Sequence, residues 1–228
     1  MKKIISLFLL LIIHTAYAQQ TRFNEKLDKF CVQSIKESET IPVDRKTMLD
    51  QIAKELSEKK YILFTCQTNS RRTILLQAWA QTSFIYYGLY NKFAFSIGDT
   101  VTAVYPEVAD ILRESGFTCN KLANENSNGY VISISEELPV NIVLSKDFLG
   151  TIDTAKGVVV SICYNGEHSN IASTLKHINL PYQSPTTFEN TPEEKKKYTE
   201  LNKQIACEMF YVAQKTKEHI IKNIKSSK

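Results

Sequence analysis

Apolar residues recur at helical spacing between residues 21 and 60. They form two stripes, one around Leu27 and one around Leu49, and Pro42 separates the two. Apolar positions at i, i+3 or i+4, and i+7 are typical of amphipathic helices. We therefore expect an N-terminal helical extension in two segments ahead of the first strand.

After residue 60, short apolar runs alternate with helical patterns. The strand candidates are 61–66, 93–97 and 157–163, and helical patterns occupy 72–87 and 106–115. A strand that is apolar at every position is buried on both faces, as in a parallel sheet. Alternation of strands and helices predicts an α/β fold. The expected architecture is a three-layer αβα domain around a four-stranded, mostly parallel sheet.

Two further patterns complete the predicted fold. Segments 130–135 and 140–144 have strand character and predict an inserted hairpin. The stretch Thr191-Pro192-Glu193-Glu194 predicts the start of a long final helix, with an N-cap, a proline at the first helical position and a capping-box glutamate. No repeat or low-complexity linker interrupts the chain, so we expect one domain over 19–228.

The first twenty residues form a separate pattern. Lys2 and Lys3 precede an apolar run over 4–13, and Ala16 and Ala18 complete a small-x-small site. This is the layout of a secretory signal peptide, and the apolar run is short for a membrane span. We expect cleavage after Ala18, a secreted or periplasmic protein, and no membrane association after cleavage. The alternative is an uncleaved N-terminal anchor.

Charge and cysteine content narrow the possible partners. The formal net charge is +4, and without Lys2 and Lys3 it falls to about +2. This charge is too small to indicate binding of nucleic acid. Five cysteines leave at least one thiol unpaired. No CxxC or Cys/His spacing is present, so the sequence predicts no metal site and no cofactor.

A cysteine and an arginine lie at the junction between the first predicted strand and its helix. The stretch reads Cys66, Gln67, Thr68, Asn69, Ser70, Arg71, Arg72 and Thr73. In a strand–loop–helix turn the loop N–H groups converge, with the positive end of a helix dipole behind them. Such a turn binds a tetrahedral oxyanion, and Arg72 can add a bidentate fork. The same field favours a Cys66 thiolate, a nucleophile beneath the anion. We expect Cys66 and Arg72 to be catalytic.

This stretch resembles the low-molecular-weight protein tyrosine phosphatases and the related thioredoxin-type arsenate reductases, whose loop reads C-x-x-N-x-x-R-S. The resemblance continues through Trp79-Ala80, residues 95–99 and residues 107–117, and it covers most of 61–214. It implies a four-stranded parallel sheet flanked by helices. It also implies that Asn69 holds the loop's shape and that Thr73 steadies the thiolate.

The chain departs from the phosphatase pattern at the general acid. The family uses an aspartate in an Asp-Pro pair on a late loop, and the matching stretch here places Ser184 before Pro185. A hydroxyl cannot protonate a leaving group as a carboxylic acid does. Glu167 or Glu189 could substitute, although no sequence pattern favours either.

The chain also departs from the reductase pattern, which needs two further cysteines. Cys163 matches the first position, but Asn170 occupies the second. Cys163 is therefore either a resolving thiol or a packing residue at a strand end. The remaining cysteines lie on apolar faces and are expected in the core: Cys31, Cys119 and Cys207.

Three functions fit these observations. The first is hydrolysis of phosphate monoesters through a cysteinyl-phosphate, slow because the family's acid is missing. The second is a non-catalytic module that binds or senses phosphate or an arsenate-like oxyanion. The third is arsenate reduction through Cys66 and Cys163. The sequence identifies no protein partner.

Overall fold

The structure is a computed structural model that describes residues 23–100, 102–122, 129–135, 141–143, 153–164, 167 and 169–226. The predicted signal peptide, 1–18, lies outside the described residues. The N-terminal extension is helical as predicted, with α2 at Glu25–Glu37, a short 3₁₀ helix at Ser38–Thr40 and α3 at Val43–Glu58. Asn24 caps α2, since its side chain accepts a hydrogen bond of 3.0 Å from the Leu27 N–H.

The main sheet has four strands in the order β2-β1-β6-β7, and every pair is parallel. The strands are β1 at Tyr61–Thr68, β2 at Phe93–Thr100, β6 at Gly157–Ser161 and β7 at Ile178–Asn179. The predicted four-stranded parallel sheet is confirmed. β1 and β2 extend beyond the predicted ends because pairing continues to Thr68 and Thr100. β6 stops at Ser161, so Cys163 lies just past the strand.

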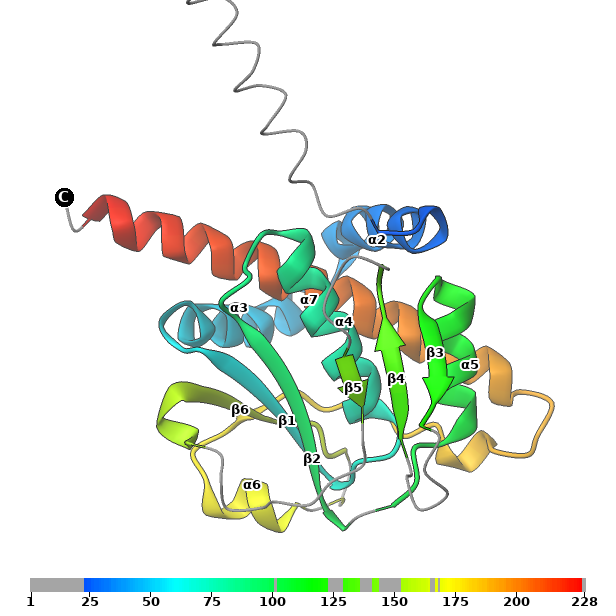
Figure 1. The fold of residues 1–228 in the computed structure, drawn as a ribbon. Helices are drawn as coiled ribbons and strands as arrows, with labels where there is room; N and C mark the ends of the chain where they lie inside the picture. Colours follow the sequence, from blue (N-terminus) through cyan, green and yellow to red (C-terminus); the bar gives the residue numbers. More distant parts are fainter. Residues whose placement is uncertain are drawn as a thin grey trace, which may run out of the picture.

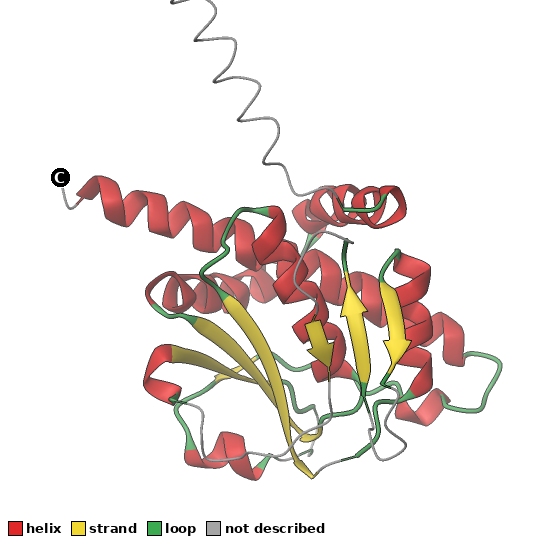
Figure 2. Ribbon diagram, viewed as in Figure 1, coloured by secondary structure: helices red, strands yellow, loops and turns green. Residues whose placement is uncertain are grey.

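Helices cover both faces of this sheet unequally, as Figures 1 and 2 show. One face is covered by α4 at Arg72–Tyr86, which packs with α2, α3, the helix at Pro106–Ser115 and the last helix into a layer of several helices. The other face is covered by the short α6 at Asn170–Thr174, which contacts β1, β2 and β6. Successive strand side chains point to opposite faces. Ile62 and Phe64 therefore join the large core, and Leu63 joins a small cluster on the α6 side.

The predicted inserted hairpin is the antiparallel pair of β4 at Tyr130–Ser133 and β5 at Asn141–Val143. A third strand, β3 at Thr118–Lys121, pairs with β4 and was not predicted, because four residues give too short a pattern. β3 follows α5, whose bounds are Pro106–Ser115. Gly116 ends α5 with φ of 107°, and a Cβ there would lie 2.4 Å from the Leu27 nitrogen.

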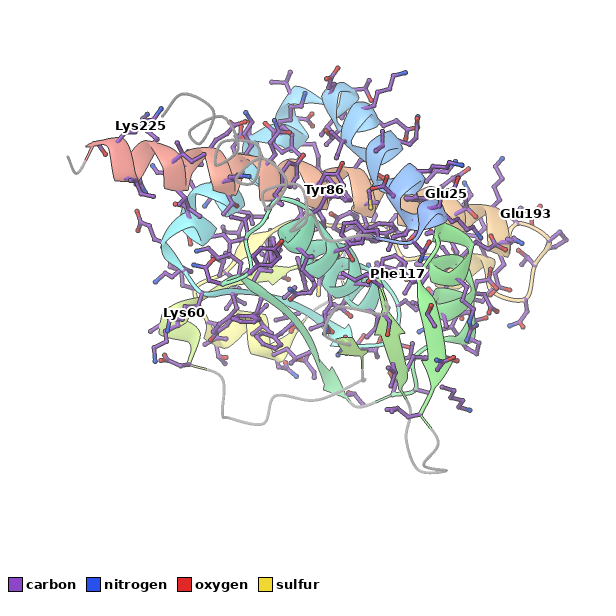
Figure 3. The ribbon with its side chains drawn as sticks, turned by 45° about the horizontal axis from the view of Figure 1, so that its top comes forward. Glu25, Lys60, Tyr86, Phe117, Glu193 and Lys225 are labelled. Carbon is purple, nitrogen blue, oxygen red and sulfur yellow. The ribbon has the colours of Figure 1, made fainter. Side chains whose placement is uncertain are left out.

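The last helix, α7, spans Glu194–Ser226 and begins two residues later than predicted. A 3₁₀ turn at Thr186–Phe188 and Asn190 at a positive φ of 61° precede it, and the Glu194 carboxylate accepts a hydrogen bond of 2.9 Å from the Asn190 N–H. α7 packs against α2, α3, α4 and α5. Figure 3 shows Glu193 and Lys225, at its two ends, near opposite sides of the molecule. Within the described residues, no helix combines the length and apolar character that a membrane span needs.

Candidate active site

The cysteine–arginine loop borders a pocket at the carboxyl ends of β1 and β6. The pocket has a volume of about 180 Å³. The lining residues are Cys66, Gln67, Thr68, Arg71, Arg72, Thr73, Ile162, Glu167, Ser184 and Thr186. The structure thus gathers most of the predicted loop around one cavity, with Arg72 at the first turn of α4, where backbone N–H groups have no acceptor within the helix.

Asn69 holds the shape of this loop, as the family resemblance implied. Its side chain is fully buried; the amide donates to the Ser96 carbonyl at 3.0 Å, and its oxygen accepts a 2.7 Å hydrogen bond from the Thr73 hydroxyl. Thr73, expected to steady the thiolate, lines the pocket and directs its hydroxyl hydrogen to Asn69. Gly98 on β2 lets the loop approach, because a Cβ there would lie 2.5 Å from the Asn69 nitrogen.

Arg72 is buried, and its guanidinium contacts one backbone carbonyl and two side chains that line the pocket. Nη1 donates to the Tyr182 carbonyl at 2.7 Å. Nη2 contacts the Cys66 sulfur at 3.4 Å and the Glu167 carboxylate at 2.8 to 2.9 Å. An internal carboxylate therefore occupies the place where the sequence predicted a bound anion. An incoming oxyanion must share Arg72 with Glu167 or displace it.

The neighbouring Arg71 also lines the pocket, but its guanidinium is paired with a second carboxylate, that of Glu189. Its Nη2 lies 2.9 Å from Glu189, its Nε contacts the same group, and its guanidinium lies 4.6 Å from the centre of the Tyr105 ring. Glu189 also accepts a hydrogen bond of 2.8 Å from the Tyr198 hydroxyl. Arg71 and Glu189 therefore brace the loop from the side of α7.

The position of the missing acid is at the pocket, as predicted. Ser184 lines the cavity, and its hydroxyl lies 3.0 Å from the Thr186 hydroxyl. Of the two glutamates that could replace the acid, Glu167 lines the pocket and Glu189 does not. Both oxygens of Glu167 contact Arg72, at 2.8 to 2.9 Å, so this carboxylate is directed at the arginine rather than at a leaving group.

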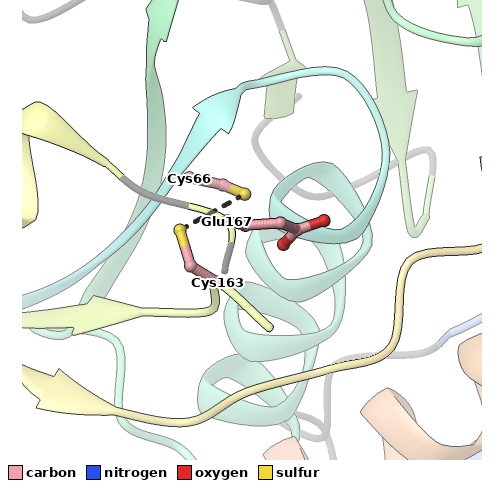
Figure 4. Close-up of side chains that lie close together, drawn as sticks. All are labelled: Cys66, Cys163 and Glu167. Carbon is pink, nitrogen blue, oxygen red and sulfur yellow. Dashed lines mark hydrogen bonds between the residues drawn. The ribbon is translucent and has the colours of Figure 1, made fainter. Parts of the chain in front are cut away.

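Cys163 lies beside Cys66, and their sulfur atoms are 3.7 Å apart (Figure 4). The hydrogen bond between the thiols lowers the pKa of Cys163 to about 6 and raises the pKa of Cys66. Two thiols that interact this closely titrate as a pair. The raised pKa of Cys66 is opposite to the lowered pKa that the sequence led us to expect, because the neighbouring Cys163 thiol and burial outweigh Arg72. Of the two predicted roles for Cys163, this placement favours the functional one.

The other residues named from the sequence lie away from the pocket. Asn170, at the position of the reductases' third cysteine, begins α6, and its N–H donates to Asp99 at 2.7 Å. The remaining cysteines are buried in helices or in β3, as predicted: Cys31, Cys119 and Cys207. Burial raises the pKa of Cys119 and of Cys207 to about 12, which makes both thiols unreactive.

Comparison with known proteins gives partial similarity of fold. No protein-family model matches the sequence, and no curated protein matches it. A YwlE mutant from Bacillus subtilis is 13% identical over 69% of this chain and 98% of its own, with a TM-score of 0.48. An arsenate reductase in the phosphate binding state is 18% identical over 72% of this chain and 98% of its own, with a TM-score of 0.40.

A thioredoxin-dependent arsenate reductase from Corynebacterium glutamicum is 18% identical. The similarity covers 81% of this chain and 72% of that protein, with a TM-score of 0.36. These three overlaps are partial. The function proposed below therefore rests on the geometry of the site.

Proposed function

We propose that this chain is an exported member of the low-molecular-weight phosphatase and arsenate-reductase superfamily that hydrolyses phosphate monoesters through Cys66. The observation that carries the proposal is the Cys66 sulfur in the pocket, 3.4 Å from Arg72 and at the start of the loop before α4. A nucleophile and an arginine donor facing one small cavity suit displacement at a tetrahedral oxyanion.

The reaction follows from these contacts. The phosphoryl group enters the pocket, and Arg72 transfers hydrogen bonds from Glu167 to the phosphate oxygens. Cys66, whose pKa is raised by the hydrogen bond with Cys163, passes its proton to the Cys163 sulfur as it attacks phosphorus. A sulfur–phosphorus bond forms, and the phosphorus–oxygen bond to the alcohol breaks. Water then hydrolyses the cysteinyl-phosphate and releases inorganic phosphate. With Ser184 in the acid position, poor leaving groups depart without the ~10²–10⁴-fold help of a general acid.

The test is an assay of the purified mature protein on an activated aryl phosphate, with acid quenching to trap phosphocysteine. Wild type and Cys119→Ser, a control thiol in β3, should both turn over slowly and label at Cys66. Cys66→Ser should be inactive and unlabelled while it still binds phosphate. Binding of phosphate without turnover by the wild type would favour the oxyanion-binding module instead.

The proximity of the two sulfurs supports a second candidate, reduction of arsenate. Cys66 would displace water from arsenate to form a sulfur–arsenic bond, and Cys163 would then attack the Cys66 sulfur. The disulfide forms as the sulfur–arsenic bond breaks, and its two electrons leave with arsenite. A dithiol protein reductant would restore the thiols. Formation of arsenite together with a Cys66–Cys163 disulfide supports this candidate, and reduction by Cys163→Ser at the wild-type rate contradicts it.

A further inference from the structure

Two thiols and a carboxylate converge in the pocket from separate parts of the chain. Cys66 ends the buried part of β1, Cys163 follows β6, and Glu167 precedes α6. The ligand atoms of the three residues all lie within 4.8 Å of one another (Figure 4). No metal-binding spacing is visible in the sequence, because 97 positions separate the two cysteines. The proposed hydrolysis uses Cys66 and leaves the convergence of all three unexplained.

The separation of the sulfurs matches a tetrahedral metal site. Two thiolates about 2.3 Å from a tetrahedral Zn²⁺ lie about 3.8 Å apart, and the two sulfurs here lie 3.7 Å apart. A carboxylate oxygen at zinc distance would lie about 3.5 Å from each sulfur. The required approach of the Glu167 oxygen is therefore about 1.3 Å at most (4.8 Å less 3.5 Å). The Glu167 side chain is 28% exposed, so it can make this approach by a rotamer change that exchanges part of its contact with Arg72.

The charges in the pocket also suit a divalent cation. With both thiols ionised, Cys66, Cys163 and Glu167 carry three negative charges, and Arg72 supplies one positive charge beside two of them. A divalent cation brings the total to neutrality. Arg72 would then act as the outer partner that hydrogen-bonds and orients ligands, as groups around metal ligands commonly do.

The ligand set selects the kind of cation. Thiolates favour zinc and other soft metals, whereas magnesium and calcium favour oxygen ligands. Three protein ligands leave a fourth position open to water, and the pocket of about 180 Å³ has room for it. We propose that Cys66, Cys163 and Glu167 form a site for a thiophilic divalent cation such as Zn²⁺. A bound cation would occupy the nucleophile and so inhibit the proposed phosphatase, and only this regulatory consequence rests on the proposed function.

The test is metal binding by the reduced, metal-free full chain. Zn²⁺ is titrated in competition with a chromophoric chelator, and Co²⁺ is added separately to detect sulfur-to-cobalt charge-transfer absorption. Wild type and Cys119→Ser should bind one ion per chain with this absorption. Cys163→Ser and Glu167→Gln should each bind at least ~10-fold more weakly, the lower end of the loss seen even for outer partners. Phosphate should compete with Zn²⁺.

Equal Zn²⁺ affinity in wild type and Cys163→Ser, or Co²⁺ bound without charge-transfer absorption, overturns the proposed site. Far-ultraviolet circular dichroism checks that Cys163→Ser folds, and if it does not, the partly exposed Glu167→Gln carries the test. The two proposals fail separately. Zn²⁺ binding without ester hydrolysis contradicts the phosphatase alone, whereas hydrolysis without Zn²⁺ binding contradicts the metal site alone.

Discussion

At the scale of single residues, the pocket is defined by the shared use of Arg72. Its guanidinium simultaneously contacts a backbone carbonyl, the Cys66 sulfur and the Glu167 carboxylate. The carboxylate satisfies a buried cation that would otherwise be costly to leave unpaired. The same contact makes Glu167 a competitor of every oxyanion that enters. The affinity for an oxyanion therefore depends on how readily Arg72 exchanges its contact with Glu167 for a contact with that oxyanion.

Glu167→Gln should therefore tighten phosphate binding. The substitution keeps the size of the side chain but removes the charge that competes for Arg72. We expect the dissociation constant of inorganic phosphate to fall ~3–10-fold, the effect of a partly exposed ion pair of about 1 kcal/mol. Isothermal titration calorimetry measures it. Glu189→Gln, which removes the carboxylate paired with Arg71, should leave phosphate affinity nearly unchanged, and unchanged affinity in Glu167→Gln would show that the carboxylate does not compete.

Arg72→Ala should abolish most of the binding of phosphate or arsenate. It removes the guanidinium that contacts Cys66 in the pocket, and the remaining Arg71 is paired with Glu189. Phosphate at about 100 times its Kd should stabilise the wild type by about 2.7 kcal/mol. Thermal unfolding with and without this phosphate measures how much of the stabilisation Arg72→Ala loses. Arg72→Lys should not restore it, because an ammonium cannot match two oxygens at once. Equal ligand-induced shifts in wild type and Arg72→Ala would place the oxyanion elsewhere.

Ser184→Asp should speed the hydrolysis of poor leaving groups. Ser184 lines the pocket and precedes Pro185, so the substitution restores the family's Asp-Pro pair. We expect a gain of ~10-fold or more in kcat for phosphotyrosine or alkyl phosphate, and little gain for activated aryl esters, since general acid help reaches ~10²–10⁴-fold. Thr186→Asp, at a neighbouring lining position, is the control. Rapid hydrolysis of phosphotyrosine by the wild type would mean that another residue already supplies the proton.

At the scale of elements, the site depends on how closely the loop packs on β2. Cys66 pairs with Gly98 across β1 and β2, and Asn69 donates to the Ser96 carbonyl on the same strand. No Cβ fits at Gly98 beside the Asn69 backbone. The second strand therefore acts as the support on which the oxyanion loop is shaped.

Gly98→Ala should distort the loop and weaken both phosphate binding and the fold. The added Cβ must push the Asn69 backbone away, because backbone atoms cannot rotate aside as a side chain does. We expect at least ~10-fold weaker phosphate binding and a loss of about 1–3 kcal/mol in the free energy of unfolding by urea. The control is Gly157→Ala on β6, where the added Cβ meets the Tyr61 ring. If both substitutions lower phosphate affinity equally, the support by β2 is not specific.

Elements with strong local signals were predictable from the sequence, and short elements were not. α5 has the predicted bounds, Pro106–Ser115, because a proline begins it and Gly116 ends it. By contrast β7 has two residues and α6 has five, too few to show a period. The start of α7 was placed two residues early because Glu194 reaches back to Asn190 rather than to the predicted cap at Thr191.

The same distinction applies to the site. Cys66, Asn69 and Arg72 lie within one stretch of seven residues, so a single loop pattern identified all three. The pairing of Arg72 with Glu167 joins residues 95 positions apart, and that of Cys66 with Cys163 joins residues 97 positions apart. Contacts between such distant residues leave no local pattern. They depend on β1 and β6 being neighbours and on where each strand ends.

At the scale of the whole molecule, α7 connects most of the helical layer. It packs against α2, α3, α4 and α5, and its buried residues run from Tyr198 to Thr216. One buried cluster contains residues from Leu27 in α2 to Ala213 in α7. Beyond Thr216 the helix is largely exposed, with Ile221 at 44% and Ile224 at 56%. The contribution of α7 to stability is therefore concentrated in its first two thirds.

Truncation should reveal this division. A chain that ends after Ile220 should unfold in urea within ~1 kcal/mol of the full chain, because surface residues contribute little. A chain that ends after Glu200 loses the buried face and should show no cooperative unfolding transition by circular dichroism. A cooperative transition in the shorter chain would show that the remaining helices and the sheet form a sufficient core without α7.

Because α7 follows α2, α3, α4 and α5 in the chain, the order of the elements has a consequence for biosynthesis. The ribosome synthesises α2, α3, α4 and α5 well before α7, which packs against all four, so their apolar faces stay uncovered until α7 emerges. Domains usually complete folding only once all their packing partners have emerged. We therefore expect the buried faces of α2, α3, α4 and α5 to stay open to solvent in the nascent chain until α7 has been made.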